Sequence, residues 1–209
     1  RDHIYEKCKN ATTVLNMLRR NLHFAPTSVK YKAYMSTVLP IIEYASICWA
    51  PTSEKMNKSI EMVQHRAVRF ILNVHTKKGE YKYISISRLL NQLQLETLEE
   101  RRVKARLIMV YKILNGHVIL DSEMLPKFKN DKPRQCNLPT VGRKNQLFEP
   151  PIGLHVTKST FFYSIKKIWN HKITKAQAEA PSIEAFKSYM KNEFLRSQTR
   201  LWLRQGAAD

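Results

Sequence analysis

Aspartate is scarce in this sequence, with only four among 209 residues: Asp2, Asp121, Asp131 and Asp209. Nucleotidyl transfer needs paired carboxylates that hold two metal ions roughly 4 Å apart, and no two of these aspartates are neighbours. Glu99 and Glu100 are adjacent, but neighbouring positions on a helix point in different directions. We therefore expect the chain by itself to have no catalytic residues, no metal site and no cofactor.

Glycine is also rare, with 5 residues where average usage of roughly 7% would give about 15. Few glycines argue against a sheet-rich fold with many tight turns and favour helices. The longest apolar run is far shorter than the ~20 residues of a membrane span, so we expect no membrane partner. The chain begins at Arg1 rather than Met, and we expect it to be a fragment.

Cysteine and histidine give no sign of a disulfide framework or a metal site. The three cysteines, Cys8, Cys48 and Cys136, are odd in number and far apart. Cys8 and Cys48 fall on apolar helix faces, which predicts buried, reduced thiols and a reducing compartment. The seven histidines are scattered without the spacing of zinc ligands, although His65 could touch a phosphate beside Arg66.

Positive charge, in contrast, is abundant. The sequence has 36 Lys and Arg against 17 Asp and Glu, a net charge of +19, and the excess is spread along the whole chain. A folded basic domain is expected to bind polyanions through phosphate contacts and counterion release. Two other interpretations stay open: a lysine-rich soluble surface, and an anionic membrane surface. The second would need one strongly basic amphipathic helix, whereas this charge is dispersed, which agrees with the expectation of no membrane partner.

The chain is organised around residues 29–72, which we expect to form two apolar-faced helices broken at residues 51–53. Pro40 should kink the first helix or split it in two. The apolar faces recur at helical intervals and comprise Val29, Ala33, Val38, Ile41, Ile42, Ala45 and Trp49, then Met56, Ile60, Val63, Ala67, Phe70 and Ile71. Basic side chains flank both faces.

Further helices are predicted on either side of this pair. The first covers residues 4–21 and ends in Arg19 and Arg20, which suit the negative end of a helix dipole. A short helix should follow around residues 84–93. Thr97 and Glu100 form a capping-box pattern that starts a helix ended by Asn115 and Gly116. Two more are predicted, around residues 161–169 and after Pro181 and Ser182.

Residues 121–154 differ in composition from the rest of the chain, since they hold five of the nine prolines and two of the five glycines. This composition predicts an irregular connector, with a short hairpin near residues 138–148. The predicted fold is therefore mainly all-α, a bundle of about five to seven helices. Its predicted parts are a helical bundle over residues 1–120, the connector over 121–154, and a C-terminal helical extension over 155–209.

Candidate phosphate-binding residues are basic side chains placed opposite the apolar faces: Lys30, Lys32, Arg66, Arg69, Arg101, Arg102, Lys104, Lys166 and Lys167. For those around Arg101, ion pairing with Glu96, Glu99 and Glu100 at helical spacing is an equally open interpretation. Five tyrosines could stack on unpaired bases, although such residues more often belong to the core or its rim: Tyr31, Tyr34, Tyr44, Tyr81 and Tyr83.

Several blocks of the chain resemble one known family. They are HIYEKCKNATTVLNMLRRNL, VKYKAYMSTVLPIIEYASICWAP, IEMVQHRAVRFIL, LQLETLEERRVKARLIMVYKILNG and FFYSIKKIWN. In this order and spacing, over about residues 3–173, they resemble the region that follows the polymerase core in jockey-type non-LTR retrotransposon reverse transcriptases. One local departure is His171-Lys172 after Trp169-Asn170, where the family tends to have Leu-Pro.

This resemblance implies a thumb-like helical bundle that grips the backbone of a template–primer duplex, either RNA–DNA or DNA. It also implies a parent RNA-directed DNA polymerase, in which a preceding palm binds the divalent metal. An intracellular, nuclear location is implied for such an element. By itself the chain would be a nucleic-acid-binding fragment. The alternative is a helical module retained by a host for protein–protein contacts.

Overall fold

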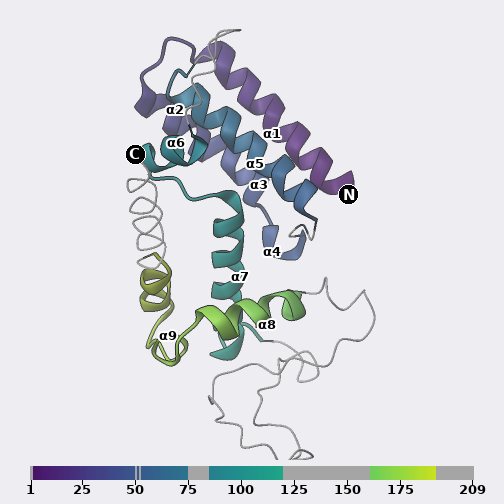
Figure 1. Ribbon diagram of the computed structural model, residues 1–209, viewed down its shortest axis with the longest axis vertical. Helices are drawn as coiled ribbons and strands as arrows, with labels where there is room; N and C mark the ends of the chain where they lie inside the picture. The colour runs from purple at the N-terminus through teal and green to yellow at the C-terminus, as the bar shows by residue number, and fades with distance from the viewer. Residues whose placement is uncertain (1, 50, 52, 75–84, 120–160, 192–209) are drawn as a thin grey trace, which may run out of the picture. The chain divides into compact units, whose positions relative to one another are not determined.

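The computed structural model describes residues 2–49, 51, 53–74, 85–119 and 161–191. The regular structure in these ranges is helical throughout (Figure 1), which confirms the predicted all-α fold. The helices are more numerous than the five to seven expected, mainly because residues 27–49 are divided into four short segments. The predicted connector over 121–154 and its hairpin lie outside the described residues.

The first helix, α1 (Asp2–Asn21), matches its prediction. Its buried face is made by Ile4, Ala11, Leu15 and Leu18, and Arg19 and Arg20 occupy its last turn. These residues are three, four or seven positions apart, which places them on one side of an α-helix, so one apolar stripe faces the core.

Four short segments take the place of the first helix of the central pair: α2 (Thr27–Ala33), the π-helical turn η1 (Tyr34–Val38), α3 (Leu39–Glu43) and α4 (Ser46–Trp49). Pro40 lies in the first turn of α3, where its missing N–H is tolerated. The Leu39 N–H reaches back to the Tyr34 carbonyl across five residues, the hydrogen bond of a π-helix. The chain breaks again at Ala45, whose φ is 54°.

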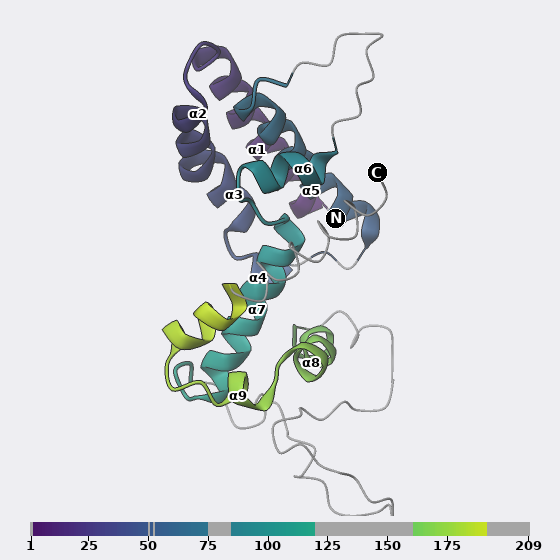
Figure 2. The same cartoon turned by 60° about the vertical axis from the view of Figure 1, so that its left-hand side comes forward.

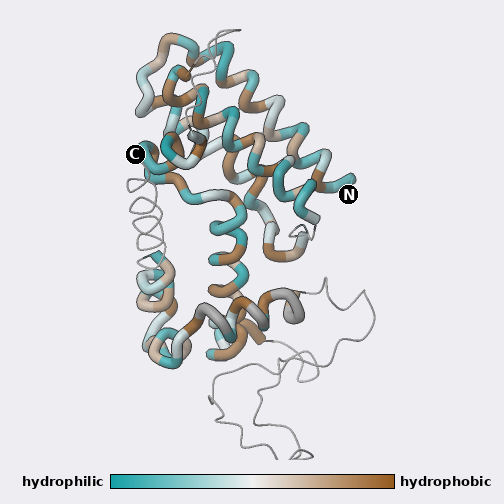
Figure 3. Tube along the Cα trace, viewed as in Figure 1, coloured by the Kyte–Doolittle hydropathy of each residue, from teal (hydrophilic) through white to brown (hydrophobic). Residues whose placement is uncertain are grey.

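The last helix of the central pair is α5 (Glu54–Ile71), capped by Ser53, whose side chain accepts a hydrogen bond from the Met56 N–H. It contacts α1, α2 and the following short helix α6 (Ile86–Gln92). Figures 1 and 2 show α1 and α5 running in the same direction. The segments α2 and α3 lead the chain back from the end of α1 toward the start of α5. Polar and apolar residues alternate along both long helices (Figure 3).

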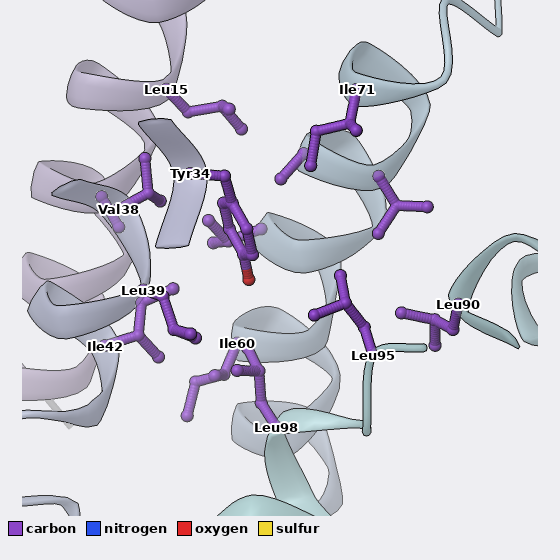
Figure 4. Packing of buried hydrophobic residues seen from close by; sticks show 14 of the residues in the cluster. Leu15, Tyr34, Val38, Leu39, Ile42, Ile60, Ile71, Leu90, Leu95 and Leu98 are labelled. Carbon is purple, nitrogen blue, oxygen red and sulfur yellow. The ribbon is translucent and has the colours of Figure 1, made fainter. Parts of the chain in front are cut away.

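One hydrophobic core joins these elements. The Tyr34 ring lies in its middle, between Leu15 and Ile42 on one side and Ile71 on α5 on the other (Figure 4). Tyr34 is fully buried, so it cannot stack on a base, and of the two interpretations given for the tyrosines the structure supports a core role for this one.

The face that α2 buries also differs from the prediction. Lys30 was expected on a basic flank and Val29 in the apolar face, yet Lys30 is 1% exposed and Val29 is 44% exposed. Lys30, Tyr34, Val38 and Ile42, which are spaced by four, are buried in this stretch together with Leu39. Val38 and Ile42 are buried as predicted, whereas over residues 29–34 the buried face is rotated by one residue from the one predicted.

The helix α7 (Leu98–Leu114) begins at the predicted capping box. The Thr97 N–H donates to Glu100 Oε2 at 3.1 Å, and the Glu100 N–H donates to Thr97 Oγ1 at 3.2 Å. Glu61 of α5 adds a second cap, because its carboxylate accepts from the Leu98 and Glu99 N–H groups at 3.3 and 2.8 Å. The helix ends before Gly116, whose φ is +71°, as the sequence predicts.

The chain divides into two compact units, residues 1–102 and 103–209. The division falls inside α7 rather than at residue 120, because Leu98 belongs to the first core whereas Leu107, Val110 and Tyr111 belong to a second. The predicted C-terminal extension thus shares a core with the second half of α7.

The second unit contains α8 (Phe161–Lys172), α9 (Lys175–Ala178) and helical residues 183–191. Ile165, Trp169 and Phe186 are buried in its core, and the Tyr111 hydroxyl donates to the Ala180 carbonyl at 2.6 Å. The Ser182 side chain accepts from the Ala185 N–H at 3.1 Å, so the last helix starts where predicted. No helix in the described parts of either unit is long and apolar enough to cross a membrane.

Candidate nucleic-acid interface

A pocket of about 840 Å³ opens in the first unit, near the ends of α1 and α5. It is lined from α1, from the turn between α1 and α2, from α2, and from α5 and the turn that follows it. The lining residues are Thr13, Asn16, Arg19, Arg20, His23, Lys30, Arg66, Arg69, Phe70, Asn73 and Val74. We call this set the basic pocket.

The basic pocket is strongly positive. Five Lys or Arg side chains line it, and none of its lining residues is acidic. Arg19, Arg20 and Arg66 are exposed and Arg69 is half-buried. None of these four arginines forms an ion pair with a carboxylate in the described part of the chain. The four guanidinium groups are thus available to an external anion.

The convergence of these arginines follows from two local patterns and one tertiary fact. On α1, Thr13, Asn16 and Arg20 lie three and four residues apart, and on α5 Arg66 and Arg69 lie three apart, so each set shares a face. Because α1 and α5 run in the same direction and contact each other, both basic ends meet at one end of the bundle. Basic residues in a last helical turn also complement the helix dipole, which accounts for some of this placement without a ligand.

Lys30 forms the inner wall of the basic pocket. Its ammonium group donates to the His23 carbonyl at 2.9 Å and to the Asn73 side-chain oxygen, and lies 5.1 Å from the centre of the Phe70 ring. Asn73 adopts a φ of 53° just after α5. Lys30 therefore ties the α1–α2 turn to the end of α5 and adds positive charge, rather than presenting its ammonium group to solvent.

The candidate residues predicted from sequence fall in different places. Lys30, Arg66 and Arg69 line the basic pocket. Lys32 is exposed on α2 but is not among its lining residues. Lys104, in the second unit, is half-buried and already has an interaction partner.

The other two candidates of the second unit, Lys166 and Lys167, both lie on α8. Lys166 is half-buried and has an interaction partner. The position of the Lys167 side chain is outside the described structure. Neither the Lys104 nor the Lys166 side chain offers the unpaired, exposed charge that distinguishes the arginines of the basic pocket.

Arg101 and Arg102 interact within the protein instead. Arg101 forms a two-pronged ion pair with Glu43, its Nη2 donating to Oε2 at 3.1 Å, and this hydrogen bonding raises the pKa of Arg101. Arg102 is 5% exposed and donates to Asn57 at 3.1 Å, with Glu61 at 3.7 Å. Of the two interpretations left open for this cluster, the geometry favours ion pairing, although with carboxylates far away in sequence.

Sequence reasoning missed Arg19, Arg20, Asn16 and His23 as lining residues. Arg19 and Arg20 were assigned only to the helix dipole. The available signal was a similar pattern on two helices, since α1 carries Arg19 and Arg20 in its last turn and α5 carries Arg66 and Arg69 in its last two turns.

The cysteine prediction needs one correction. Cys8 is half-buried and burial raises the pKa of its thiol, but Cys48 is exposed rather than buried. Cys48 lies in α4, a single short turn whose only buried residue is Ser46. The apolar pattern around Cys48 therefore does not correspond to one continuous buried face.

No group of three or more His, Cys, Asp or Glu side chains in the described ranges is arranged to hold a metal ion. What these ranges do contain is a concentrated set of Lys and Arg side chains around one pocket. No protein-family model, curated protein or solved structure gives a significant match to the chain, so the family resemblance drawn from its sequence stays a prediction.

Proposed function

We propose that this chain binds nucleic acid through its phosphate backbone, at the basic pocket. The observation that carries the proposal is the convergence of Arg19, Arg20 and Arg66 with Arg69 at one end of a bundle, with no carboxylate among the lining residues. Arginine is suited to this task because its planar guanidinium matches phosphate geometry with paired hydrogen bonds. The net charge of +19 adds long-range attraction.

The sequence resemblance extends this proposal. In a thumb-like region of a non-LTR reverse transcriptase, the phosphates would belong to the template–primer, and a palm elsewhere in the parent polypeptide would supply the metal and the catalysis. The proposal does not require the chain itself to be an enzyme. It competes with the alternative of a protein–protein interaction module, which the same experiment separates.

The test is the salt dependence of binding to a short DNA duplex and to the corresponding RNA–DNA hybrid. Each phosphate contact contributes roughly 0.9 to the slope of log affinity against log salt on B-form DNA. Reversing Arg66→Glu and Arg69→Glu together should therefore lower the DNA slope by about two. Binding is measured by fluorescence anisotropy over a salt series.

A matched control is the pair Lys9→Glu and Lys55→Glu, on the same two helices. Both lysines are exposed, and each lies about 15 Å or more along its helix axis from the arginines, at 1.5 Å per residue. The control makes the same change in net charge, so it should leave the slope almost unchanged. An equal fall in both variants would mean that overall charge, not the basic pocket, binds the backbone. Binding that ignores salt would instead favour the protein–protein module.

A further inference from the structure

We propose that the basic pocket takes an unpaired nucleic-acid strand, with one base stacked on Phe24. This inference rests on the proposed function and specifies its substrate class. The phosphate contacts alone would serve a duplex and a single strand alike, so the distinction depends on the side chains at the edge of the pocket.

Phe24 is the most exposed of the large hydrophobic side chains in the described structure, at 96%. It lies in the turn between α1 and α2, next to His23, which lines the basic pocket. The two rings meet nearly at right angles, with centroids 4.7 Å apart. Exposure this high leaves the Phe24 ring accessible to a partner.

The turn that carries Phe24 is held on both sides. The Leu22 N–H donates to the Leu18 carbonyl at 2.8 Å, and the Ala25 N–H donates to the Leu22 carbonyl at 3.1 Å. Lys30 holds the His23 carbonyl from α2, and Pro26 follows directly with its fixed φ. Because the backbone of this turn is already held in place, stacking a base on the ring would require little further ordering of the protein.

An open aromatic face beside a group of cations is the arrangement by which proteins hold single strands. Cations follow the backbone while aromatic rings stack on successive bases, whatever their sequence. The bases inside a duplex are already stacked on each other, so they cannot use Phe24. The volume of about 840 Å³ is within the range of pockets for small ligands. It admits a flexible strand, whereas a duplex can only lay one backbone across its mouth.

An acidic protein or another polyanion would use the arginines but would have no need of the ring. Phe24 therefore separates these partners from nucleic acid. Among the exposed aromatic residues of the same unit, Tyr5 is 73% exposed and lies at the opposite end of α1 from the basic pocket. It provides a matched control for the loss of an exposed ring.

The experiment compares a short single strand, the duplex of the same sequence, and that duplex with a single-stranded overhang. Phe24→Ala should weaken single-strand and overhang binding by about 5- to 150-fold, the range for one base–aromatic stack, and should change duplex affinity less than twofold. Phe24→Trp should retain single-strand binding, and Tyr5→Ala should leave all three affinities unchanged. Circular dichroism checks that each variant is folded.

A second readout uses single strands with one abasic position moved along the sequence. At the position that meets Phe24, the loss of the base should weaken binding to the unaltered protein and cause no further loss in Phe24→Ala. Equal effects of Phe24→Ala on strand and duplex, or none on either, would overturn the stacking proposal while leaving backbone binding intact. If no nucleic acid binds the unaltered protein in a salt-dependent way, the proposed function fails as well.

Discussion

The buried ammonium group of Lys30 supports the wall of the basic pocket from inside the protein. All its contacts in the described structure are to uncharged groups: a backbone carbonyl, an amide oxygen and an aromatic ring. A buried charge is costly unless such partners surround it. Its contribution is therefore to hold two chain segments together at the basic pocket.

Replacing Lys30 with Met should lower the free energy of unfolding by about 1.5–3 kcal/mol, the usual range for hydrogen bonds to a charged group. Met keeps most of the side-chain volume but leaves the His23 carbonyl and the Asn73 oxygen without their donor. The exposed neighbour Lys32→Met is the control and should stay within about 0.5 kcal/mol of the parent. Urea unfolding measures both. Equal small effects would show that Lys30 contributes nothing beyond its apolar stem.

His65 should make the stability of the first unit depend on pH. Burial, followed by the nearby charge of Arg69, lowers the pKa of His65 from its ordinary value of 6.5. The unfolded chain therefore binds this proton more readily than the folded chain, and acidification below about pH 6.5 should destabilise the fold.

His65→Gln should reduce the loss of stability between neutral and mildly acidic pH, because the variant has no proton to take up at this position. The comparison is between urea midpoints of the parent and the variant at each pH, with His3→Gln as the control. A parent and a His65→Gln variant that lose the same stability on acidification would contradict the prediction.

At the scale of elements, the start of α7 depends on a carboxylate from another helix. Glu61 accepts hydrogen bonds from two N–H groups of the first turn, and lies near Arg102. Burial raises the pKa of Glu61, although these two hydrogen bonds act in the opposite direction. A negative group at a helix N-terminus is favourable, so Glu61 connects α5 to α7 through both hydrogen bonds and charge.

Glu61→Ala should therefore destabilise the protein by about 2–3 kcal/mol, since it leaves N–H groups and a buried guanidinium partly unsatisfied. The control is Glu54→Ala on the same helix, whose pair with Lys58 is a highly exposed one and should be worth less than about 1 kcal/mol. Chemical denaturation followed by circular dichroism compares the two. A similar effect of both variants would mean that the capping box alone starts α7.

Sequence patterns predicted the elements whose signals are local. The helix α1, the capping box of α7 and the start of the last helix at Ser182 all depend on residues within a few positions of one another. The pairing of Arg101 with Glu43 joins residues 58 positions apart, and no periodicity within α7 could indicate it. The same applies to the meeting of Arg19 and Arg69, which requires the relative direction of α1 and α5.

At the scale of the whole molecule, the described residues form two separate hydrophobic cores, and the helix α7 contributes to both. The sequence around residues 98–114 shows an apolar pattern, but the pattern does not tell which core each apolar residue joins. Leu98 and Tyr111 are both almost fully buried, yet they belong to different clusters. Periodicity identifies a buried face and leaves open what covers it.

The π-helical turn at Tyr34–Val38 affects which side chains of this segment face the first core. Lys30, Tyr34, Val38 and Ile42 repeat every four residues, and over 12 residues a regular α-helix would rotate such a series by about 120° away from a straight line. Wider π-helical spacing compensates for this drift. One residue more than a regular helix requires keeps all four side chains on a single line, so a one-residue deletion within this turn would restore a regular α-helix and leave the segment beyond it in phase with α1 and α5.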